Sequence, residues 1–175
     1  MATFDDLHLA MGRFLTESSH VENVMFSLYY VCTPNQSIDR RYEFMDETFG
    51  RKITIFKAAC NAHPFSDEHR AILTDAYNDL DVLLPKRNFI VHGSTHHIGL
   101  SDKPPQPYRI GKRKGDYNFL NNAILNDFTD PHVFTIERIN KVTEQFIALG
   151  SKLATVATEM MMALVQSFTA TTRNC

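Results

Sequence analysis

Two long apolar stripes with helical spacing constrain the fold of this chain more than any other feature of its sequence. In the first stripe, apolar residues recur at alternating steps of three and four, which places them on one face of an α-helix. Its members are Phe4, Leu7, Met11, Phe14, Val21, Met25, Leu28 and Cys32, with the polar Ser18 at one position. Pro34 and the polar residues 35–37 follow, and because proline disrupts a helix we expect the first helix to end there.

The second stripe lies near the carboxyl end and is as regular as the first. Its members are Ile139, Val142, Phe146, Leu149, Leu153, Val156, Met160 and Ala163. Thr135, with Glu137 close behind it, can cap the start of this helix by accepting a hydrogen bond from a free backbone amide. The apolar stretch from Leu153 to Phe168 is interrupted by polar residues and is short for a bilayer, so we expect no membrane segment.

Two shorter helices are predicted between the stripes. One has the apolar residues Met45, Phe49, Ile53, Phe56 and Cys60 and should end before Pro64. The other should start at Ser66, and its expected buried face consists of Ile72 or Leu73, Ala76, Leu80 and Leu83. Pro85 should break or restart this second helix, and Gly93 should end it in a left-handed conformation.

Residues 94–132 differ from the rest of the chain because prolines and glycines replace the helical period. Apolar and polar residues alternate at 97–100, 108–112 and 132–135, which predicts a small β-hairpin or a three-stranded patch, and 118–126 fits one short helix. The whole sequence therefore predicts a single domain, residues 1–175. Its fold class is all-α, a bundle of four to five helices with a small β-hairpin or irregular insert at about 94–132.

The composition favours an intracellular protein without a strong overall charge. Lys and Arg total 18 against 20 Asp and Glu, so the net charge of −2 creates no global field that attracts nucleic acid, and any RNA contact must be local. Cys32, Cys60 and Cys175 lack CxxC spacing, which predicts neither a disulfide framework nor a zinc cage. The amino end carries Asp5 and Asp6 and no secretory signal. We expect a cytoplasmic protein.

The segment Arg87-Asn88-Phe89-Ile90-Val91-His92-Gly93 combines residue types suited to cleaving a phosphodiester. Arginine offers a permanently charged fork for phosphate oxygens, and histidine can give or take a proton near neutral pH. Asn88 can hold either of them in place. His92 falls at a predicted helix carboxyl end, where the helix dipole favours the imidazolium and its use as a proton donor.

This segment resembles the signature of the HEPN superfamily, helical-bundle proteins named for higher eukaryotes and prokaryotes nucleotide-binding. That signature is an arginine, preferably followed by Asn, Asp or His, and then a histidine after four to six residues, late in the bundle. The order of a long first helix, a second helix, a third that leads into the motif and a long last helix is also similar. The proline-containing insert goes beyond the family's minimal pattern.

The resemblance implies a metal-independent endoribonuclease that forms a homodimer, in which two copies of the motif face each other across a cleft. His92 would act as acid or base on the 2′-hydroxyl or the leaving oxygen, Arg87 would stabilise the phosphorane, and Asn88 would support them. It also implies a role in toxicity, defence or stress, and leaves an antitoxin or a nucleotidyltransferase open as protein partner. The alternative is a non-catalytic dimeric module for helical interaction or nucleotide binding. The nucleotide-binding form lacks support from a phosphate-binding loop, because the chain has no GxxxxGK[ST] motif.

Two structural interpretations compete with catalysis at this motif. Arg87 could pair with Asp79 or Asp81, and His92 could pack against a helix end.

The spacing of the two motif residues also limits how they can cooperate. Five residues on a regular helix rotate by about 500°, or about 140° net, so Arg87 and His92 do not share a face. The length of the arginine, or unwinding before Gly93, must therefore bring the two groups together.

Basic and aromatic residues cluster once, after the motif. Arg109, Lys112, Arg113 and Lys114 lie between Tyr108 and Tyr117 and are the candidate RNA-binding residues, because such groups neutralise phosphates and stack on bases. The alternative is a charged hairpin tip that protects an edge strand.

Histidines also cluster near the motif, at His92, His96 and His97, with His132 farther on. No carboxylate or cysteine completes a familiar ligand spacing. We therefore expect a solvated loop at these residues, and neither a metal nor another cofactor.

Overall fold

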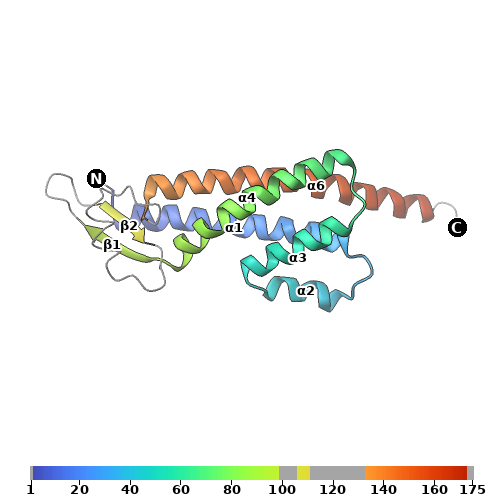
Figure 1. Ribbon diagram of the computed structural model, residues 1–175, viewed down its shortest axis with the longest axis horizontal. Helices are drawn as coiled ribbons and strands as arrows, with labels where there is room; N and C mark the ends of the chain where they lie inside the picture. The colour runs from blue at the N-terminus through green and yellow to red at the C-terminus, as the bar shows by residue number, and fades with distance from the viewer. Residues whose placement is uncertain (1, 99–105, 111–132, 173–175) are drawn as a thin grey trace. The chain divides into compact units, whose positions relative to one another are not determined.

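The chain is an all-α bundle with a small antiparallel sheet. The computed structural model describes residues 2–98, 106–110 and 133–172. Its elements in chain order are α1 (Phe4–Cys32), α2 (Ile38–Asp46), α3 (Phe49–Ala62), α4 (Asp67–His92), β1 (Ser94–Ile98), β2 (Gln106–Ile110), β3 (Val133–Thr135) and α6 (Ile136–Thr172) (Figure 1). The first long helix has the bounds that its apolar stripe predicts.

The chain divides into two compact units. One comprises residues 1–18 and 82–146, and the other comprises 19–81 and 147–175. The boundary between the two units falls inside α1, α4 and α6. It therefore does not coincide with a loop or linker that could be recognised in the sequence.

The first unit contains the start of α1, the end of α4, the sheet and the start of α6. Phe14 of α1 and Phe146 of α6 pack edge to face with their ring centroids 5.4 Å apart, a geometry that stabilises a core beyond the area it buries. Among the described residues of this unit, the buried apolar ones are Leu7, Ala10, Phe14, Leu83, Ile90, Val133, Phe134, Ile139, Val142 and Phe146.

The three strands form one antiparallel sheet in the order β1-β2-β3. Ser94 pairs with Ile110 at one end of the β1–β2 ladder, and Ile110 pairs with Val133 in the β2–β3 ladder. Of the two forms that the sequence allowed, the three-stranded patch is therefore the one present. The predicted short helix at 118–126 lies outside the described residues.

The second unit contains α2, α3 and the remaining parts of α1, α4 and α6. Its buried apolar residues include Val21, Met25, Leu28, Phe44, Phe49, Ile53, Phe56, Cys60, Leu73, Ala76, Leu80, Leu149, Leu153 and Val156. Gly150 lets α6 approach α1 closely, because a Cβ there would lie 3.2 Å from the ring of His20.

The region expected to form one helix from Met45 to Cys60 forms two. The Thr48 hydroxyl accepts a hydrogen bond from the amide of Arg51 and caps the start of α3, while α2 ends at Asp46. A threonine in an extended conformation offers the backbone an alternative to continuing the helix. As a result Phe44, which is 2% exposed, contributes to the core, whereas Met45 is half-buried.

The break expected at Pro85 is absent. Helix α4 runs from Asp67 to His92 with Pro85 inside it, and it ends just before Gly93 as predicted. Proline in a helix removes one hydrogen bond and crowds the preceding turn. Pro85 lies on an exposed face, so the buried Leu83 and Ile90 on either side continue the packed face and hold the helix together.

The predictions for α6 are correct at its start and wrong at its end. The amide of Arg138 donates to the Thr135 hydroxyl at 3.3 Å, which confirms the predicted cap. The stripe is buried from Ile139 to Val156, but Met160 is half-buried and Ala163 exposed. A regular stripe fixes the face of a helix, whereas burial also requires another element to cover that face.

By length and composition, α6 over Ile136–Gln166 is the one helix of the described residues that could cross a membrane. Its most apolar stretch has a mean hydropathy of 1.3, and 28% of that stretch is buried. We expected no membrane segment because only the residues from Leu153 onward were compared with the thickness of a bilayer. The apolar part of α6 begins before Leu153. Core helices of soluble proteins meet the same criterion.

Candidate functional site

Arg87 occupies a position on the buried face of α4. Leu83 and Ile90 on that face are 2% and 0% exposed, and Arg87 continues the same spacing between them. Its side chain is half-buried. Burying a charged group is costly unless it binds a partner, so this position distinguishes Arg87 from the solvated arginines of the chain.

The two carboxylates considered as structural partners of Arg87 each bind a lysine. Asp79 accepts a hydrogen bond from Lys152 at 2.7 Å, and Asp81 accepts one from Lys57 at 2.7 Å. Both carboxylates thus have a cationic partner of their own.

Asn88 and His92 share a different face of α4, and both are exposed. Residues four apart are neighbours on a helix surface, so Asn88 can support the imidazole of His92. The helix stays regular through His92, so the unwinding that would bring His92 round to Arg87 is absent up to that residue. One copy of α4 therefore directs Arg87 and His92 about 140° apart.

Arg109, on strand β2, holds the carboxyl end of α4. Its Nε donates to the carbonyl of Ile90 at 2.6 Å, and its Nη2 donates to the carbonyls of Val91 at 3.1 Å and Gly93 at 2.5 Å. Its Nη1 donates to the Thr95 hydroxyl at 2.9 Å. The last carbonyls of a helix have no partner within the helix, and this guanidinium supplies one. Burial lowers the pKa of Arg109 below its usual value.

This structural role changes the expectation for Arg109. The sequence predicts it as an RNA-binding residue together with Lys112, Arg113 and Lys114. Its guanidinium already donates four hydrogen bonds within the chain, which leaves it poorly placed to bind a phosphate. Lys112, Arg113 and Lys114 lie outside the described residues, and their RNA contact stays a prediction.

A basic hollow beside the motif was missed by the sequence analysis. Lys86 of α4 and Arg138 and Lys141 of α6 line a space of about 230 Å³, with Phe134 at its wall. Lys86 donates to Gln145 of α6 at 3.2 Å. Arg138 and Lys141 lie three residues apart on one helix face, but only the fold brings Lys86 to them. The three-residue spacing of Arg138 and Lys141 was the one sequence signal for this hollow, and it is weak on its own.

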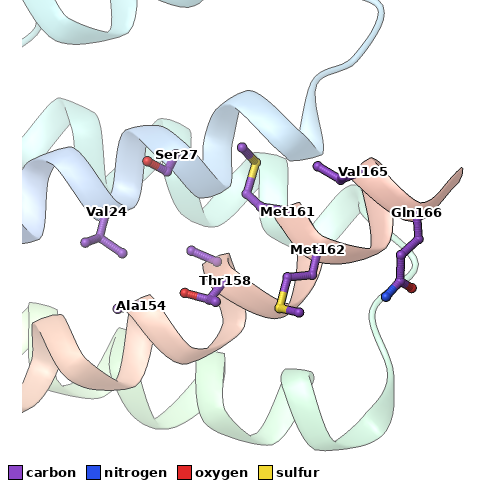
Figure 2. A pocket seen from close by; sticks show the side chains of 9 residues that line it. Val24, Ser27, Ala154, Thr158, Met161, Met162, Val165 and Gln166 are labelled. Carbon is purple, nitrogen blue, oxygen red and sulfur yellow. The ribbon is translucent and has the colours of Figure 1, made fainter. Parts of the chain in front are cut away.

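An apolar groove of about 630 Å³ lies in the other unit, between α1 and α6 (Figure 2). Its lining residues are Val24, Ser27, Ala154, Ala157, Thr158, Met161, Met162, Val165 and Gln166. Met162 and Val165 are 58% and 60% exposed. Of the three consecutive methionines, Met160 is half-buried, whereas Met161 and Met162 are exposed. Contiguous exposed apolar side chains mark interaction surfaces.

Within the described ranges, no group of three or more His, Cys, Asp or Glu is placed to hold a metal ion. His92 is exposed, the side chains of His96 and His97 lie outside the description, and so does all of His132.

Compared with family models, with curated proteins and with solved structures, the chain matches none of them. The relationship to the HEPN superfamily therefore stays a prediction from the motif and from the order of the helices.

Proposed function

We propose that this chain is a HEPN-like, metal-independent endoribonuclease that acts as a homodimer. The observation that carries the proposal is the arrangement of residues at the carboxyl end of α4. His92 and Asn88 are exposed there, and Arg87 begins the motif on the buried face. Arg109 of β2 donates hydrogen bonds to the carbonyls at this helix end and holds it in place. Catalytic groups act best when their supporting elements are rigid before the substrate arrives.

The geometry of one helix favours a site made by two chains. Because Arg87 and His92 diverge by about 140°, one phosphate is more easily reached by Arg87 of one protomer and His92 of the partner subunit. As base, an imidazole removes the proton of the RNA 2′-hydroxyl, and the 2′-oxygen attacks phosphorus. Arg87 balances the charge of the phosphorane, and an imidazolium returns a proton to the leaving 5′-oxygen. The products are a 2′,3′-cyclic phosphate and a 5′-hydroxyl.

The basic hollow supports a path for the RNA strand next to the motif. Lys86 is adjacent to Arg87 in α4, and Arg138 and Lys141 face the same space from α6. Three cations there can neutralise phosphates on either side of the bond that is cut. This local charge is what a chain with a net charge of −2 requires if it is to bind RNA.

The test is cleavage of single-stranded RNA in the presence of EDTA. We expect His92→Ala and Arg87→Ala each to lower the rate by about 10²–10⁴-fold, because each removes a group that acts in the transition state. His8→Ala on α1 and Arg51→Ala on α3 are matched controls, since both side chains are exposed and neither belongs to the motif. A 2′-deoxynucleotide at the cut position should block cleavage. Wild-type rates in both motif variants would overturn the mechanism.

The proposal extends to the setting in which the enzyme acts. A metal-independent ribonuclease in the cytoplasm needs restraint, which fits a toxin, defence or stress role with an antitoxin or a nucleotidyltransferase as partner. Co-purification of the full chain with the product of a neighbouring gene, and loss of RNA cleavage in that complex, would support this setting. A partner that leaves cleavage unchanged would contradict it.

The apolar groove favours a second candidate function, a non-catalytic module that associates with a second copy of itself. Met162 and Val165 leave large apolar side chains exposed on α6, and burying them against another copy would remove that surface from water. Met162→Glu and Val165→Glu should then convert a dimer to a monomer in sedimentation. The wild-type protein should in that case show no RNA turnover. A wild-type monomer would exclude this function.

A further inference from the structure

Two cysteines that are distant in the sequence meet in the second unit. Cys32 is the last residue of α1 and Cys60 lies in α3, and their Sγ atoms are 4.0 Å apart. Both are free thiols. Cys32 is partly exposed, whereas Cys60 is 2% exposed. A solvent-accessible thiol beside a buried one is the arrangement in which the first can react and the second can resolve the product.

The surroundings of the pair distinguish its two members. The hydrogen bond to Cys60 lowers the pKa of the Cys32 thiol. The same contact, together with burial, raises the pKa of Cys60, whose sulfur also has a hydrogen bond with Tyr77. Of the two thiols, Cys32 therefore loses its proton more readily, and the thiolate is the form of cysteine that reacts with oxidants.

A buried cation binds the backbone at the same end of α1. Arg41 is 7% exposed, and its guanidinium donates to the carbonyls of Thr33 at 3.0 Å and Pro34 at 2.6 Å, the two residues after Cys32. These two hydrogen bonds fix the chain where α1 ends and so help to hold Cys32 beside Cys60.

We propose that Cys32 and Cys60 form a peroxide-oxidised pair that closes to a reversible intramolecular disulfide. The Cys32 thiolate attacks one oxygen of hydrogen peroxide, the O–O bond breaks, and Cys32 becomes a sulfenic acid as hydroxide leaves and takes up a proton to form water. Cys60 then loses its proton and its sulfur attacks the Cys32 sulfur, and the sulfenic oxygen leaves as a second water. Two thiols and one peroxide thus give one disulfide and two waters.

The disulfide would tie the end of α1 to α3 across the segment that holds α2. A cross-link that closes such a loop removes freedom from the unfolded chain. The oxidised protein should therefore unfold at a higher temperature, by about 5–10 °C for a chain of this size. The thiol pair lies outside the unit that contains Arg87 and His92, so this proposal does not depend on ribonuclease activity.

The experiment treats the full chain carrying Cys175→Ser with hydrogen peroxide, alkylates it, and maps the products by mass spectrometry. We expect an intramolecular link between the peptides of Cys32 and Cys60, a mass loss of two hydrogens, and reversal by dithiothreitol. In Cys60→Ser the reaction should stop at a Cys32 sulfenic acid that dimedone traps. In Cys32→Ser the buried Cys60 should oxidise at least about 10-fold more slowly.

Three outcomes would overturn the proposal. They are oxidation of Cys32 to the sulfinic acid while Cys60 stays reduced, preferential oxidation of Cys60, and a disulfide between two chains. Circular dichroism checks that each single variant is folded. If one is not, the order of alkylation of the two thiols in the Cys175→Ser protein decides the same question, because Cys32 must react first.

Discussion

Arg109 shows why single residues of this chain could be only partly interpreted from the sequence. Its charge and the neighbouring Tyr108 resemble an RNA-binding cluster, and nothing local indicates that β2 places it against the end of α4. For Arg87 the sequence predicted only that it does not share a helix face with His92. Its place on the buried face between Leu83 and Ile90 was not predicted, because a break was expected at Pro85. Short-range spacing thus predicted the divergence of the two motif residues, whereas the contacts of Arg109 depend on a strand pairing.

Arg109→Lys should lower the free energy of unfolding by about 3 kcal/mol. An ammonium cannot reproduce the fork that donates to three carbonyls, and each buried carbonyl left without a donor costs about 1–3 kcal/mol. Urea denaturation measures the loss. The matched Arg51→Lys, on an exposed part of α3, should change stability by less than about 0.5 kcal/mol. Equal stability of the two variants would show that Arg109 does not hold the helix end.

At the scale of helices and strands, the apolar spacing in the sequence predicted the features that depend on neighbouring residues, namely helix bounds and caps. The bounds of α1, the cap at Thr135 and the end of α4 before Gly93 followed from the sequence. The split at Thr48 did not, because the apolar spacing continues across it from Met45 to Phe49. The exposed end of α6 was also missed, since a stripe does not reveal where its covering partners stop.

Two lysines that join helices should differ greatly in their contribution to stability. Lys52 of α3 binds Glu22 of α1 at 2.6 Å, with side chains only 8% and 16% exposed. Lys152 of α6 binds Asp75 and Asp79 of α4, with side chains between 36% and 62% exposed. Lys52→Met leaves a buried carboxylate and should cost about 3 kcal/mol, whereas Lys152→Met should cost less than about 1 kcal/mol.

Urea denaturation at low and high salt checks this contrast. The effect of Lys152→Met should shrink in 1 M salt, because exposed charges are screened, and the effect of Lys52→Met should persist. Equal costs for the two variants, or a cost of Lys52→Met that vanishes in salt, would contradict the burial of the Lys52–Glu22 pair.

At the scale of the whole molecule, the all-α class and the small sheet were predictable because two long stripes and one proline-containing insert leave few other architectures. The proposed RNA surface was less predictable. Lys86 and Lys141 belong to separate helices, and no sequence window contains both. The divergence of Arg87 and His92 is the property that makes association of two chains necessary for the proposed site.

The most direct test of the proposed ribonuclease is the rate of RNA cleavage per chain in EDTA, measured across protein concentrations at which sedimentation gives the dimer fraction. We expect the rate per chain to rise in proportion to the dimer fraction, and His92→Ala to remain inactive at every concentration. A rate per chain that is the same for monomer and dimer would contradict the two-chain site. Undiminished cleavage by His92→Ala would contradict the assignment of the site to this motif.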